Sequence, residues 1–206
     1  MADVTAPDAT RARLLAAARR QFAERGFYGA SIAQIAGEVG LTKQALLYHF
    51  KRKEDLYAEV LKGIAGRLVS VLDAAADQGL PAEQELSEML LGVHAASQAD
   101  PRDTRILMRE LLDNQVRAPM ANDWFLKTFL DRICATFRRI EGLTNLSFAQ
   151  AFIHIYQVLG SIEYFAISRP TLEQMYGTDG YARFQNGFPR VLRGQIARMI
   201  ASARAA

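Results

Sequence analysis

Side chains that can read DNA bases gather at the start of a short segment near residue 43. Lys43 and Gln44 open this segment, where a lysine can donate to guanine and a glutamine can pair with adenine. Ala45 and Leu47 are small or apolar groups that suit contact with a thymine methyl. If the segment is a helix, these four residues predict direct reading of base edges.

A second set of side chains suits the DNA backbone better than the bases. Basic and aromatic groups, and hydroxyls at helix N-termini, can bind phosphates, which position a protein without specifying a sequence. The candidates are Ser31, Thr42, Tyr48, His49, Lys51 and Lys53. The alternative for each of them alone is a capping hydroxyl or a solvated charge, so the prediction depends on their grouping.

Catalytic and metal-binding patterns are missing from the sequence. The histidines His49, His94 and His154 have no metal-ligand spacing, and Cys134 has no local catalytic signature. No glycine-rich phosphate loop or nucleophile elbow is present. We therefore expect no catalytic residue, no metal and no cofactor. Two rivals stay open, an architectural DNA-coating protein without an effector and a helical enzyme whose cysteine and histidine meet only in space.

Three short predicted helices hold the DNA-reading candidates. The first runs over about residues 10–26 and ends in a glycine, which favours the position just after a helix. Ser31 can cap a second helix over 32–39, and Thr42 can cap a third over 43–49. Only a Gly-Leu turn separates the last two helices, a spacing typical of a helix-turn-helix whose second helix enters the major groove.

The charge distribution agrees with a nucleic-acid-binding segment at the N-terminal end. Residues 1–53 hold nine Lys and Arg against four acids, a balance of +5, and the remaining residues hold sixteen against eighteen. The whole chain of 206 residues is 50% hydrophobic and 23% charged, which is globular composition. The N-terminus lacks a signal peptide pattern, no apolar stretch is long enough for a bilayer, and one cysteine suits a reducing compartment. We expect a cytoplasmic protein without membrane contact.

Beyond residue 53 the apolar spacing predicts longer helices and no strand. Prolines at positions 81 and 101 open helices, and those at 119 and 170 are predicted to end them. The expected helices cover about residues 54–78, 81–98, 102–117, 122–141, 147–168 and 181–203, with a loop over 169–180. The fold prediction is all-α with about nine helices. Residues 1–53 form the DNA-binding domain behind a disordered arm, 1–9, and residues 54–206 form the second domain.

The N-terminal segment resembles the DNA-binding domain of the TetR family of bacterial transcriptional regulators. The resemblance covers residues 10–61, about a quarter of the chain, and is much more specific than a bare helix-turn-helix. The matching positions are Phe22, Gly26, Phe27, Ser31, Ile32, Ile35, Ala36, Gly40, Leu41, Thr42, Leu46, Tyr48, His49, Phe50, Lys53 and Leu56. Leu47 stands where the family usually has Tyr, and Gln44 where it has Gly or Pro. An operator therefore cannot be borrowed from a relative.

The resemblance implies a ligand-responsive, sequence-specific regulator of transcription. Its expected form is a homodimer whose last two helices pair with those of its mate, and its expected partner is a double-stranded, pseudo-palindromic operator. A small-molecule effector would bind among the middle helices and release a repressor from DNA. An apolar pocket containing Met and Phe favours a hydrophobic or aromatic effector.

One C-terminal helix is expected to lie between subunits. The segment 147–168 is apolar on more than one side, and a helix that needs burial on two sides favours a partner subunit. The alternative is a central core helix. The predicted dimer interface residues are Ile153, Tyr156, Gly160 and Tyr164.

The predicted effector pocket consists of aromatic and apolar residues at helical spacing. His94 is the most informative member, because a buried histidine needs a hydrogen-bond partner. The alternative for each member is plain core packing. The candidates are Met89, Leu90, Val93, His94, Met108, Leu111, Leu112, Trp124, Phe125, Phe129, Cys134 and Phe137.

Overall fold

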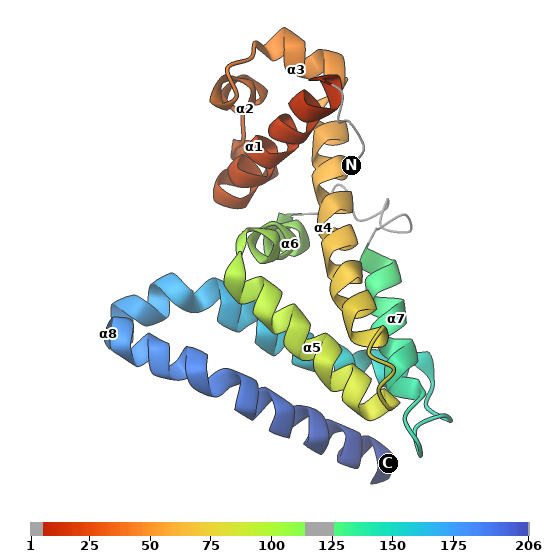
Figure 1. The fold of residues 1–206 in the computed structure, drawn as a ribbon. Coiled ribbons are helices and arrows are strands. Elements are labelled where there is room, and N and C mark those ends of the chain that lie inside the picture. Colours follow the sequence, from red (N-terminus) through yellow and green to blue (C-terminus); the bar gives the residue numbers. More distant parts are fainter. Residues whose placement is uncertain (1–5, 114–125, 206) are drawn as a thin grey trace. The chain divides into compact units, whose positions relative to one another are not determined.

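The computed structural model describes residues 6–113 and 126–205, and every regular element in those ranges is an α-helix. The prediction of an all-α fold is confirmed for this part of the chain. The eight helices are α1 (Ala6–Gly29), α2 (Ile32–Glu38), α3 (Lys43–His49), α4 (Lys53–Ala76), α5 (Ala82–Ala99), α6 (Arg102–Asp113), α7 (Leu126–Arg138) and α8 (Phe148–Ala205) (Figure 1). Among the described residues, none of these helices is both long and apolar enough to cross a membrane.

The chain divides into two compact units. The first comprises Met1–Gly66 and Arg105–Asn122, and the second comprises Arg67–Thr104 and Asp123–Ala206. The chain passes from one unit to the other within α4 and again within α6. These units differ from the predicted domains 1–53 and 54–206, because the first half of α4 and most of α6 group with the N-terminal helices. Helix α1 begins at Ala6, inside the stretch expected as an arm.

The first unit is built on a small core that α1, α2, α3 and α4 share. Its fully buried side chains include Leu14, Phe22, Ile35, Leu46 and Leu56. The rings of Phe22 and Tyr57 meet edge to face with centroids 4.8 Å apart, an arrangement that aromatic pairs prefer. This packing places α3 on a rigid support.

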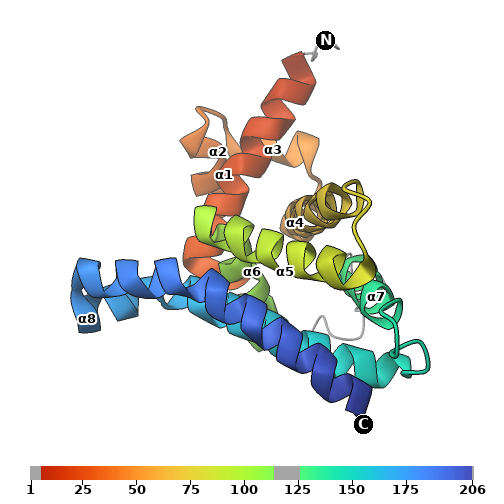
Figure 2. The ribbon, with the colours of Figure 1, turned by 60° about the horizontal axis from the view of Figure 1, so that its bottom comes forward.

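The second unit is a helical bundle around α5. One continuous cluster of buried side chains joins α5 to α7 and to both halves of α8. Figure 2 shows α5 lying along α8. The cluster includes Leu86, Leu90, Val93, Ile133, Phe137, Ile155, Ile162, Leu192 and Ile196.

The predicted ending of a helix before Pro170 is wrong. Helix α8 continues through Pro170 and breaks at Gly177, where φ is 73° and ψ is 166°. The chain then folds back and stays helical past Pro189 (Figures 1 and 2). A proline removes one backbone hydrogen bond and kinks a helix, whereas a glycine at positive φ can reverse its direction at no steric cost. The expected loop at 169–180 is therefore a single break at Gly177.

Candidate nucleic-acid interface

Helix α3 is held by a cap at one end and by two buried side chains. The Thr42 hydroxyl accepts a hydrogen bond from the Ala45 backbone N–H at 3.2 Å, which confirms the predicted cap. Leu46 is fully buried and Phe50 is 3% exposed, so this side of the helix faces the core. The opposite side of its first turn, with Lys43 and Gln44, is exposed to solvent.

The turn between α2 and α3 depends on a glycine. Gly40 has a φ of +73°, a conformation that side chains with a Cβ rarely adopt, although an added Cβ would meet no atom within 4 Å. The Leu41 N–H donates to the Ala36 carbonyl at 2.9 Å and closes the end of α2. Backbone conformation, and not crowding, therefore requires glycine in this turn.

Helix α1 contacts the end of α2 through two of the nine basic residues counted in 1–53. Arg13 donates to the Val39 carbonyl at 2.9 Å, and Arg20 forms an ion pair with Glu38 at 3.0 Å. Gln21 also donates to the Glu38 carboxylate. Arg13 and Arg20 therefore stabilise the packing of α1 on α2. The lysines near α3 contribute more of the positive charge that is available to DNA.

The other residues predicted to contact DNA differ in the solvent exposure of their side chains. Tyr48 is 88% exposed, and its ring meets that of His49 edge to face. Ala45, Leu47 and His49 are half-buried. The half-buried Lys53 places its Nζ 4.7 Å from the centroid of the Phe27 ring, and burial lowers the pKa of this ammonium.

Ser31 has the backbone conformation of an N-cap residue, with φ −107° and ψ 130°, but its side chain makes no capping hydrogen bond. The predicted side-chain cap is therefore wrong. The first backbone hydrogen bond of α2 runs from the Ile35 N–H to the Ser31 carbonyl, at 2.9 Å. The half-buried Ser31 hydroxyl keeps its hydrogen-bonding capacity for another partner.

The predicted pocket residues are divided between the two units. Met89, Leu90, Val93, His94, Phe129, Cys134 and Phe137 are buried in the second unit. Met108 is half-buried in the first unit, where Leu111 and Leu112 are 46% and 79% exposed. Those two exposed leucines line no buried cavity in the described chain, because α6 turns them to solvent. Trp124 and Phe125 lie outside the described residues.

His94 differs from a satisfied core histidine. It is 5% exposed, its Nδ1 has no hydrogen-bond partner, and burial lowers the pKa of its ring. The ring stacks on Phe188 with centroids 4.6 Å apart. The sequence singled out His94 because it stands among apolar residues of a predicted helix. In the structure its Nδ1 lacks the hydrogen-bond partner that a buried histidine needs.

An open groove of about 460 Å³ runs between α4 and α5 in the second unit. It contains none of the residues predicted for the pocket. Gly92 brings the two helices close together there, since a Cβ on it would lie 2.7 Å from the Val71 side chain. The lining residues are Val71, Ala74, Ala75, Gln78, Glu88, Leu91, Gly92 and Ala95. Six of these eight residues are alanine, glycine, glutamine or glutamate. The sequence therefore shows no run of large apolar side chains that would predict this groove.

The predicted dimer residues share one exposed side of α8. Ile153, Tyr156 and Tyr164 are 57%, 48% and 72% exposed, and Gly160 lies exposed between them. The other side of the same helix is buried through Ile155 and Ile162 and their neighbours. A row of exposed large apolar side chains on one helix is typical of a surface that another protein covers.

Comparison with known proteins points to one family. Residues 14–60 match the family described as "Bacterial regulatory proteins, tetR family". The chain is 29% identical over 177 residues to the HTH-type transcriptional regulator RutR of Escherichia coli K12, covering 84% of this chain and 81% of RutR.

Solved structures share the fold at low identity. A putative transcriptional regulator from Pseudomonas aeruginosa PAO1 aligns with a TM-score of 0.73 at 18% identity, covering 98% of this chain and 95% of that one. A TetR-like regulator from Rhodococcus sp. RHA1 aligns with a TM-score of 0.70 at 18% identity, covering 94% and 97%. At such identities the likeness concerns the fold.

Proposed function

Because this chain belongs to the TetR family of bacterial transcriptional regulators, we propose that it is a repressor released from a pseudo-palindromic operator by a small molecule. The family is one of DNA-binding regulators, so the chain is a regulator and not an enzyme. The proposed active form is a homodimer, and the proposed effector is a small molecule with a hydrophobic or aromatic body.

One observation carries the proposal of sequence-specific binding. Helix α3 buries Leu46 and presents Lys43 and Gln44 on its exposed first turn. In a helix-turn-helix this turn reaches the base edges in the major groove. Lys43 and Gln44 offer donors and acceptors that distinguish base pairs there, which a protein that merely coats DNA does not need.

The experiment that tests this proposal is a footprint on the DNA flanking the gene. A regulator protects one short pseudo-palindrome, whereas an architectural protein protects DNA diffusely. Protection that is lost upon addition of a small molecule supports the effector part. Diffuse protection, or none at all, would overturn the proposal.

Substituting Gln44 should separate base reading from phosphate binding. We expect Gln44→Ala to cost about 1–3 kcal/mol per half-site at one base position, and Lys53→Ala to weaken binding to all sequences alike. Fluorescence anisotropy with the operator, its single-base variants and random DNA measures both effects. Thermal melting serves as a control for Lys53→Ala, since its ammonium also contacts the Phe27 ring. Equal losses on operator and random DNA for both variants would show that Gln44 does not read bases.

A leucine at position 160 should weaken the proposed dimer without disturbing the subunit. An added Cβ on Gly160 meets no atom within 4 Å in the single chain, so the subunit tolerates a side chain there. At a close helix seam the same side chain overpacks, at a cost of about 1–3 kcal/mol. We expect sedimentation equilibrium to show a raised dimer dissociation constant for Gly160→Leu, but not for Ala96→Leu, at an exposed position of α5. A Gly160→Leu protein that dimerises as tightly as wild type would place the interface elsewhere.

A further inference from the structure

Helix α6 from Arg105 onward belongs to the first unit, where its side chains reach the DNA-binding helices. The Tyr57 hydroxyl donates a hydrogen bond to Glu110 Oε2 at 2.7 Å, across 53 positions of the chain. Tyr57 and Glu110 are 4% and 2% exposed. The neighbouring Arg109 donates to the Glu24 backbone carbonyl at 3.0 Å. Within this unit α6 is therefore bonded to both α4 and α1.

The Arg109 contact falls where α1 needs a donor from outside the helix. Helix α1 breaks at Gly26, which has a φ of 69° and a ψ of 178°. Carbonyls in the last turn before a helix ends lack partners within the helix, and a basic side chain can supply one. Glu24 lies in that turn, so the Arg109 guanidinium stabilises the end of the first part of α1.

Tyr57 connects α6 to the lysine that is predicted to bind phosphate. Its ring meets the Phe27 ring edge to face, with centroids 5.1 Å apart and planes at 62°. The Nζ of Lys53 lies over the Phe27 ring, 4.7 Å from its centroid. An aromatic face attracts an ammonium, so the position of the ring helps to fix the position of the charge. We call Glu110, Tyr57, Phe27 and Lys53 the α6–Lys53 series.

Replacing Glu110 by an apolar residue takes an acceptor away from a buried hydroxyl. A buried polar group whose hydrogen bond is broken is costly, and its side chain lowers the cost by turning toward another partner. Tyr57 can turn only by disturbing its edge-to-face contacts with Phe22 and Phe27, whose centroids lie 4.8 and 5.1 Å away. Because Lys53 lies over the Phe27 ring, the disturbance reaches its ammonium.

We propose that Glu110 is a positioning residue for DNA binding, which acts through Tyr57 and Phe27 to hold Lys53 where it meets a phosphate. The inference rests on the proposed function, because it concerns the same DNA-binding surface. It adds to that surface a residue of α6, outside the predicted DNA-binding domain 1–53 and outside the segment 14–60 that matches the family.

Glu110→Leu should weaken operator binding about tenfold or more at physiological salt, since one phosphate contact is disturbed in each subunit. The slope of log affinity against log salt should become shallower by about one to two for the dimer. The direction is diagnostic, because removing an acidic side chain would by itself strengthen binding to DNA. Glu110→Gln should restore most of the affinity, since its amide oxygen can still accept from Tyr57. Fluorescence anisotropy over a salt series measures both quantities.

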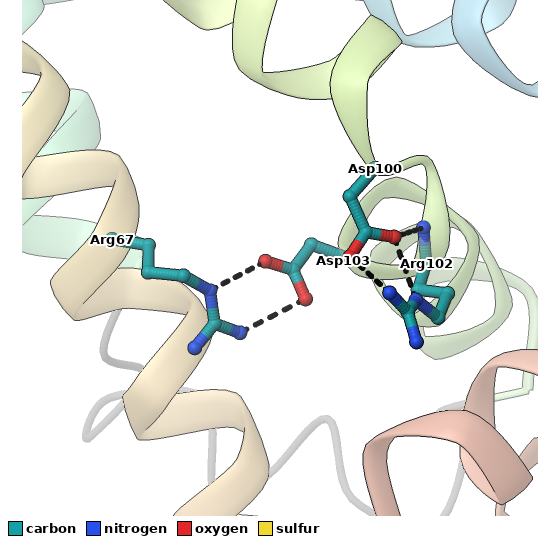
Figure 3. A network of polar contacts seen from close by, with 4 residues as sticks. All are labelled: Arg67, Asp100, Arg102 and Asp103. Carbon is teal, nitrogen blue, oxygen red and sulfur yellow. Dashed lines mark hydrogen bonds and ion pairs between the residues drawn. The ribbon is translucent and has the colours of Figure 1, made fainter. Parts of the chain in front are cut away.

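Asp103→Leu is the matched control. Asp103 also lies on α6 and accepts two hydrogen bonds from an α4 side chain, that of Arg67, at 2.8 and 2.9 Å (Figure 3). This pair belongs to the second unit. The substitution removes the same charge from the same helix and breaks a contact with the same neighbouring helix, so we expect operator affinity and salt slope to stay as in wild type. Equal losses for Asp103→Leu and Glu110→Leu would reveal a general effect of α6 and contradict the role of Glu110.

Tyr57→Phe tests the same link if Glu110→Leu does not fold. It keeps the ring and removes only the hydroxyl, so we expect a smaller loss of operator affinity in the same direction. Replacing both partners by apolar groups is less costly than removing one, so Tyr57→Phe combined with Glu110→Leu should lose less affinity than the two single losses predict together. Additive losses would mean that the two residues act independently, and the α6–Lys53 series would then be wrong.

A spectroscopic readout reports the position of Lys53 without DNA. The ε-methylene of Lys53 adjoins the Nζ that lies over the Phe27 ring, so the ring current shifts its protons upfield. We expect proton–carbon correlation spectra, assigned with Lys53→Arg, to show this shift in wild type and in Asp103→Leu but not in Glu110→Leu. If Glu110 only stabilises the fold, Glu110→Leu lowers Tm and leaves both the shift and the salt slope as in wild type, which overturns the proposal.

Failure of this inference and failure of the proposed function give different results. If wild-type protein binds an operator with a steep salt slope and Glu110→Leu binds it equally well, the proposed function stands and the positioning role is wrong. If wild-type protein binds no DNA, both are wrong, even where the Lys53 shift responds to Glu110→Leu.

Discussion

Raising the salt concentration from about 50 to about 200 mM should weaken operator binding by the dimer roughly ten-thousandfold. If each subunit neutralises about four phosphates, the slope of log affinity against log salt is roughly −7. The exposed Lys43 and Lys51 contribute to this footprint, together with helix N-termini. Arg13 and Arg20 contribute less, because the structure uses them to hold α2. Fluorescence anisotropy over a series of salt concentrations measures the slope.

The slope also has a matched pair of control variants. Lys51→Ala should make it shallower by about two for the dimer, since each lost phosphate contact removes about one. Lys127→Ala removes a lysine of the second unit that pairs with Asp131 and should leave the slope unchanged. A wild-type slope shallower than about −3 would contradict the phosphate contacts assigned to α3 and its surroundings.

Phe129→Ala is expected to destabilise the protein by about 3–5 kcal/mol, the usual cost of truncating a buried phenylalanine. Phe129 was predicted to line the effector pocket, but it is 4% exposed and belongs to the continuous core of the second unit. With about 2–4 °C of Tm per kcal/mol for a chain of this length, Tm should fall by roughly 10 °C. Chemical denaturation with urea measures the free energy of unfolding.

Leu112→Ala is the control, because it truncates another predicted pocket residue that is 79% exposed. We expect its unfolding free energy to stay within about 0.5 kcal/mol of wild type. Should Phe129→Ala melt like wild type and instead reduce the response to an effector, Phe129 would be a pocket wall and the core assignment would be wrong.

The helix-turn-helix was determined by the sequence within a few residues. Thr42 caps α3, and Gly40 has the positive φ that the turn before it requires. Leu46, in the middle of α3, is buried. Capping, glycine conformation and apolar spacing all act between near neighbours, so they can be read without knowing the fold. The family resemblance rested on these same residues and is confirmed.

The second unit could be predicted only in outline. Helical spacing identified its helices, because a buried helix face repeats along the sequence. It did not show that α8 continues through Pro170 and reverses at Gly177, since both residues are common at helix ends. Which of the two reverses the chain depends on how both halves of α8 pack against α5.

Only the tertiary structure determined which polar side chains form hydrogen bonds and which apolar side chains are buried. Glu163 meets Ser97 across 66 positions, and Tyr181 meets Gln98 across 83. It likewise buried Phe129 and left Leu112 in solvent, although both had helical apolar spacing. Burial and hydrogen bonding are properties of a side chain's neighbours in space, and in this unit those neighbours come from distant helices. The sequence could therefore indicate the DNA-binding helices, but not the contact of Glu163 with Ser97.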